Sequence, residues 1–140
     1  MFHPWRLLRS RPHLRLVVDD LGDDGPLGTY DGRTITLTTR LLQVERRCAV
    51  LHELIHDERG IPHEHDPAEE IAVEREVARR LIPIDALIRV AKMGLSLHDA
   101  ADELWVTEDV LRCRLASITH PAERRAWRAA LEQMGEHGGC

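Results

Sequence analysis

The sequence predicts a single α+β domain, in which a small N-terminal β region precedes a series of helices. Two patterns support this prediction. Before residue 39, alternating apolar residues and a turn sequence favour strands, whereas beyond it apolar residues recur at helical spacing. A chain of 140 residues can bury one hydrophobic core but is too short for two full ones. We therefore expect one domain over residues 1–140.

The β region is predicted from two local signals. Leu14, Leu16 and Val18 alternate along a short segment, which is typical of a strand. Asp31-Gly32 stands between two stretches of β-forming residues, 29–30 and 33–37, and this pattern is typical of a hairpin. The first dozen residues, rich in Arg, Pro and His, are expected to form a mobile lead-in.

Six helices are predicted after residue 39. The first carries Val44, Cys48, Leu51 and Ile55 at helical spacing and ends at Gly60. The N-cap signals that open the fourth and fifth helices are Ser96 and Thr107. The second, third and last helices are expected over residues 68–82, 84–93 and 121–134.

Composition limits the functional class. Asp and Glu number 24 against 19 Lys and Arg, which gives a formal net charge of -5 and counts against a protein that coats nucleic acid. The three cysteines show no paired spacing, and no apolar stretch is long enough for a signal or membrane helix. We therefore expect a cytoplasmic protein that binds neither nucleic acid directly nor a membrane.

The motif that carries chemistry is His52-Glu53-Leu54-Ile55-His56. Residues four apart share one face of a helix, so both imidazoles can bind a single metal ion. Imidazole suits Zn²⁺, and a catalytic zinc keeps three protein ligands and a water molecule. Zinc lowers the pKa of that water towards about 7, and Glu53 is placed to take its proton as general base.

A third zinc ligand is required, and several residues could supply it. On a helical wheel of residues 68–82, Glu74 falls near the middle of the apolar side, where a buried carboxylate needs a cation. We therefore predict that Glu74 is the ligand. The alternatives are Glu70, one turn earlier, Glu76, and the loop histidines His63 and His65. The apolar side is predicted to consist of Ile71, Val77, Ala78, Leu81 and Ile82.

Residues 33–117 resemble the ImmA/IrrE family of zinc metallopeptidases. The similar segments, in order, are the strand 34–37, the helix 46–56 with its His-Glu-x-x-His motif, the glutamate helix 74–83 and the helical pair 101–115. The resemblance implies a zincin-like core over residues 14–93, followed by a helix-turn-helix-like segment over residues 95–134. It also implies a cytoplasmic peptidase that cleaves a DNA-binding helix-turn-helix repressor.

Further expectations concern the substrate and the partner. Extended substrates of such enzymes usually lie beside an edge strand, and residues 34–37 are the predicted edge. The segment 96–117 carries more acidic than basic residues, so we expect it to pack on the core or hold the repressor rather than bind DNA. The alternative function is a non-catalytic zinc-containing binding protein that acts as an antirepressor.

Overall fold

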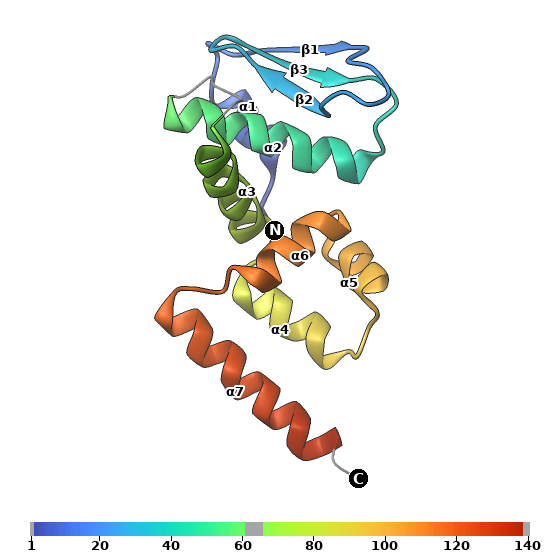
Figure 1. The fold of residues 1–140 in the computed structure, drawn as a ribbon, viewed down its shortest axis with the longest axis vertical. Coiled ribbons are helices and arrows are strands. Elements are labelled where there is room, and N and C mark those ends of the chain that lie inside the picture. Colours follow the sequence, from blue (N-terminus) through green and yellow to red (C-terminus); the bar gives the residue numbers. More distant parts are fainter. Residues whose placement is uncertain (1, 61–65, 139–140) are drawn as a thin grey trace. The chain divides into compact units, whose positions relative to one another are not determined.

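A computed structural model describes residues 2–60 and 66–138 (Figure 1). Within these ranges the chain is α+β, as predicted, with seven helices and one three-stranded sheet. It divides into two compact units, Met1–Val77 and Ala78–Cys140, and the boundary falls within helix α3 (Pro67–Leu81). None of the helices in the described part of the chain has the length and apolar character needed to cross a membrane.

The sheet of the first unit consists of β1 (Arg15–Asp19), β2 (Gly28–Tyr30) and β3 (Thr34–Thr38). The hairpin prediction is confirmed, because β2 and β3 pair antiparallel across Asp31-Gly32. The prediction that residues 34–37 form an edge is wrong. The strand order is β1-β3-β2, since β1 pairs in parallel with the other side of β3 and leaves it in the centre.

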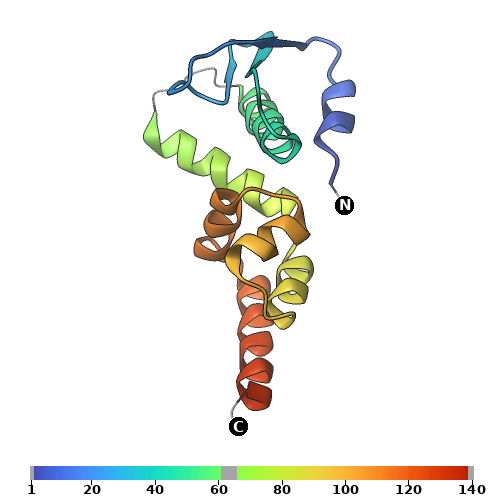
Figure 2. The ribbon, with the colours of Figure 1, turned by 90° about the vertical axis from the view of Figure 1, so that its right-hand side faces the viewer.

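Helix α2 (Gln43–Arg59) covers one face of this sheet, as Figures 1 and 2 show. The core between them is aliphatic apart from one tyrosine, and consists of Tyr30, Ile35, Leu37, Ala49, Val50 and Leu54. The predicted mobile lead-in instead contains a helix, α1 (Pro4–Arg9). Proline suits the first position of a helix, and Trp5, Leu7 and Leu8 pack against the core cluster, so burial orders this segment.

Two local features fix the ends of the helices that flank residues 61–65. Gly60 adopts the left-handed conformation (φ 68°) that commonly ends a helix, and its N–H donates to carbonyls in the last turn of α2. Helix α3 begins with Pro67, and the Asp66 carboxylate accepts a hydrogen bond from the N–H of Ala68 at 3.0 Å. Glu69 and Glu70 consequently lie in the first turn of α3.

The second unit contains α4 (Ile84–Lys92), α5 (Leu97–Leu104), α6 (Glu108–Ala116) and α7 (Pro121–Gly138). Helix α4 contacts both α5 and α7, and α5 contacts α6. Both predicted caps are confirmed. Ser96 accepts a hydrogen bond from the N–H of Asp99, and Thr107 accepts one from the N–H of Val110. Helix α7 continues beyond its predicted end at residue 134.

Candidate metal centre

Three potential metal ligands converge in the first unit, two from α2 and one from α3. The Glu70 carboxylate lies 3.0 Å from His52 Nε2 through Oε2 and 2.7 Å from His56 Nε2 through Oε1. One ligand atom from each of the three residues lies within 4.8 Å of the others. A second such group in the described residues consists of His98, Asp99 and Asp102, and all three are exposed.

The helical spacing of the motif produces this arrangement. The two imidazoles stand one turn apart on α2, with ring centroids 5.0 Å apart. His56 is only 2% exposed, and its Nδ1 is buried without a hydrogen-bond partner. Burial lowers the pKa of His52, which favours the neutral ring, and neutral imidazole is the form that binds a metal ion.

The predicted apolar side of α3 is confirmed at Val77, Ala78, Leu81 and Ile82, which are buried, but it is wrong nearer the start of the helix. Glu74 was placed near the centre of the buried side, but its side chain is exposed, as is Ile71 at 47%. Val73, which the helical wheel left out of the apolar side, is fully buried. Glu70, the alternative one turn earlier, therefore faces the histidines. Neither Glu74 nor Glu76 belongs to the converging group, and His63 and His65 lie outside the described residues.

Glu53, the predicted general base, is 5% exposed and packs close to the edge strand β2. A Cβ atom at Gly28 would lie 3.4 Å from Glu53 Cγ, and 3.2 Å from both the Thr36 carbonyl oxygen and a methyl group of Leu37. Glycine at position 28 therefore lets β2 approach this side of α2. Among the described residues, no strand pairs with the outer side of β2.

A second carboxylate of the motif helix, Asp57, was missed by the sequence analysis. It accepts hydrogen bonds from the Tyr30 hydroxyl at 2.5 Å, Arg11 at 2.6 Å and His13 Nε2 at 3.1 Å. Burial alone would raise the pKa of Asp57, but these hydrogen bonds outweigh it and lower the pKa. Asp57 thus joins β2 and the segment before β1 to α2, beside His56.

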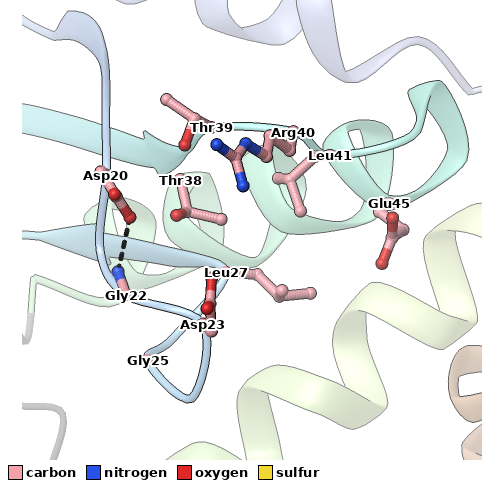
Figure 3. A pocket seen from close by; sticks show the side chains of 10 residues that line it. All are labelled: Asp20, Gly22, Asp23, Gly25, Leu27, Thr38, Thr39, Arg40, Leu41 and Glu45. Carbon is pink, nitrogen blue, oxygen red and sulfur yellow. Dashed lines mark hydrogen bonds between the residues drawn. The ribbon is translucent and has the colours of Figure 1, made fainter.

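A small hollow of about 190 Å³ lies at the start of β2, at the end of the strand away from Tyr30 (Figure 3). Its walls come from the loop after β1 and from the connection between β3 and α2. Leu27, directly before β2, and Arg40, with a left-handed backbone (φ 66°), contribute to the lining. The Asp20 carboxylate accepts a hydrogen bond from the N–H of Gly22. None of the metal-centre residues lines this hollow.

Comparisons of the chain with protein-family models, with curated proteins and with solved structures found no match. The convergent residues and the sequence pattern are therefore the basis for a functional proposal.

The Tyr30–Asp57 hydrogen bond can be tested directly, because Tyr30 is the only tyrosine in the chain. Burial, together with the hydrogen bond to Asp57, raises the pKa of Tyr30 to about 12. A spectrophotometric titration of tyrosinate should therefore give a midpoint near this value in the folded protein. The unfolded chain ionises near the ordinary pKa of about 10, so the free energy of unfolding should fall as pH rises between these values.

Asp57→Asn should move the midpoint of the Tyr30 titration back towards that of the urea-unfolded protein. A midpoint near 10 in the folded wild type would contradict the geometry.

The close approach at Gly28 predicts that Gly28→Ala destabilises the protein. The added methyl group must displace Leu37 or the backbone at Thr36, and such overpacking costs about 1–3 kcal/mol. Urea unfolding measures this change. Gly135→Ala is the control, because its Cβ would meet open space on a helix and should be neutral or stabilising. Equal effects of the two substitutions would contradict the proposed packing.

Proposed function

We propose that His52, His56 and Glu70 form a zinc site. Two imidazole nitrogens and one carboxylate oxygen are a donor set that zinc uses in catalytic centres. Tetrahedral zinc with bonds of about 2.0–2.2 Å requires its donors to lie about 3.3 Å apart. The two Nε2 atoms lie 3.0 and 2.7 Å from different oxygens of Glu70, closer than this separation, so the side chains must move apart to admit the ion.

We propose further that the protein is a zinc metallo-endopeptidase. A bound zinc ion would act as a Lewis acid towards a peptide carbonyl and would lower the pKa of a water molecule. Glu53 carries the only carboxylate of the five-residue motif. Its role is to take the proton of the attacking water and to pass it to the leaving amine, as a general base and then a general acid. The support for this role is its place next to His52 and its packing against the edge strand.

The open side of β2 is the candidate binding site for an extended peptide, in place of residues 34–37. Strand addition supplies backbone hydrogen bonds to a substrate of any sequence. β2 is the edge strand that contacts α2, and Gly28 brings it against Glu53. A peptide paired with β2 would therefore run past the general base.

The proposed substrate is a helix-turn-helix repressor encoded nearby, cleaved in an exposed segment in the cytoplasm. This proposal rests on the resemblance to the ImmA/IrrE family, which implies a zincin-like core and a helix-turn-helix-like segment. In that segment, α5 and α6 are joined by a short turn whose first residue, Trp105, has a left-handed backbone. The first turn of α6 carries Glu108 and Asp109, which disfavours DNA phosphates and favours a basic protein partner.

A second candidate function is a non-catalytic antirepressor that binds zinc and holds the repressor without cutting it. The observation that favours this alternative is the acidic α5–α6 segment, which suits a basic partner whether or not cleavage follows.

The zinc site predicts about one zinc ion per chain in protein purified without an affinity tag. His52→Ala and His56→Ala should lose it. Glu70→Ala should weaken zinc binding strongly, because it removes a convergent donor, whereas Glu74→Ala on the same helix is the matched control and should bind zinc as the wild type does. Elemental analysis and competition with a chelator measure these changes. Strong loss in Glu74→Ala with none in Glu70→Ala would restore the original assignment.

The peptidase proposal predicts that Glu53→Gln keeps its zinc but loses cleavage by orders of magnitude, since the carboxylate that accepts the proton is gone. The zinc form is incubated with the neighbouring repressor, and fragments are identified by mass spectrometry. If wild type and Glu53→Gln both release the repressor from operator DNA without cutting it, the protein is an antirepressor rather than a peptidase.

A further inference from the structure

An ion pair joins the two helices that supply the metal centre. Arg59, in the last turn of α2, binds Glu69, in the first turn of α3, through two parallel contacts. Arg59 Nε contacts Glu69 Oε1, and the second bond, from Nη2 to Oε2, measures 2.9 Å. The Glu69 side chain is 11% exposed and that of Arg59 is 41% exposed. This hydrogen-bonded pairing with Arg59 lowers the pKa of Glu69, so the carboxylate stays charged.

The pair lies directly beside the candidate ligands. Arg59 follows His56 by three residues, which places both on neighbouring positions of one helix side. Glu69 directly precedes Glu70, and successive side chains of a helix point about 100° apart. One carboxylate therefore faces the arginine while the next faces the two imidazoles. A guanidinium that binds both carboxylate oxygens fixes orientation as well as distance.

From this geometry we infer that the Arg59–Glu69 ion pair is a positioning device for the third zinc ligand. It holds the first turn of α3 against the last turn of α2, so that the Glu70 carboxylate meets His52 and His56. It also occupies Glu69, which would otherwise be a competing carboxylate one residue from the ligand. This inference rests on the zinc site proposed above.

If the pair positions Glu70, its removal should lower zinc affinity much more than it lowers the stability of the zinc-free protein. Outer groups that orient metal ligands typically change metal affinity by about 10- to 100-fold when removed. A partly exposed ion pair, by contrast, contributes little to stability. Arg59→Ala and Glu69→Gln should therefore weaken zinc binding by about this factor, with little change in the melting temperature of the zinc-free protein.

The test compares the full-length wild type with both single variants and with the charge-swapped double variant Arg59→Glu, Glu69→Arg. Zinc affinity is measured by competition with a chelator, and the melting temperature is measured without zinc. The double variant should regain part of the affinity lost in the single ones, because it restores an ion pair between the same helix ends. Arg89→Ala is the matched control, since it breaks the Arg89–Glu103 pair (3.2 Å), which involves none of the zinc ligands, and it should leave zinc affinity unchanged.

The possible outcomes distinguish failure of the positioning role from failure of the zinc site. Wild-type zinc affinity in Arg59→Ala and Glu69→Gln would overturn the positioning role while the zinc site stands. A loss of affinity that is matched by a large loss of zinc-free stability, and not recovered by the charge swap, would show a merely structural pair and overturn it too. A wild type that binds no zinc would overturn the proposed site, and the inference with it.

Discussion

The arrangement of the metal centre depends on the contacts between the Glu70 carboxylate and the two imidazoles of α2. His56 is almost completely buried, and a buried imidazole loses its hydrogen bonds to water unless another group replaces them. Glu70 supplies that group to His56 Nε2 at 2.7 Å and also contacts His52 Nε2 at 3.0 Å. These contacts require the first turn of α3 to lie at the last turns of α2. The Asp66 cap and the Arg59–Glu69 pair are local features that meet this requirement.

Much of this fold could be predicted because its signals are local. A capping hydroxyl such as Ser96 acts on an N–H three residues away, and the Asp31-Gly32 turn joins adjacent strands. The spacing of His52 and His56 likewise fixes their shared helix face without reference to the rest of the chain. The end of α2, both limits of α3 and α4, and the starts of α5 and α6 were therefore predicted to within a residue, and the pairing of β2 with β3 was predicted correctly.

The remaining features depend on partners distant in sequence. A helical wheel of α3 ranks faces by hydrophobicity alone, yet Ile71 is exposed and Val73 is buried. The face that packs is determined by what lies opposite, and here that includes polar imidazoles, which turn Glu70 inward. Strand order is a similar case. Residues 34–37 have the same local pattern in an edge or a central strand, and only the parallel pairing of β1 decides between them. Asp57 gave no signal because all three of its donors lie well before it in the chain.

Helix α2 buries polar side chains as well as the apolar ones that pack against the sheet. Ala49, Val50 and Leu54 are the apolar residues that α2 contributes to the core cluster beneath the sheet. The same helix nevertheless buries the side chains of Glu53 and His56, although burying such groups costs stability unless partners compensate. Asp57, also largely buried, has compensation from three donors that tie down β2 and the N-terminal segment. His56 is compensated only in part, because its Nε2 contacts Glu70 at 2.7 Å while its Nδ1 has no partner. Buried polar groups that exceed the needs of packing are typical of functional sites, where local consistency is given up for chemistry. The buried polar side chains of the C-terminal half of α2 therefore make this region, rather than the hollow at the start of β2, the candidate functional site.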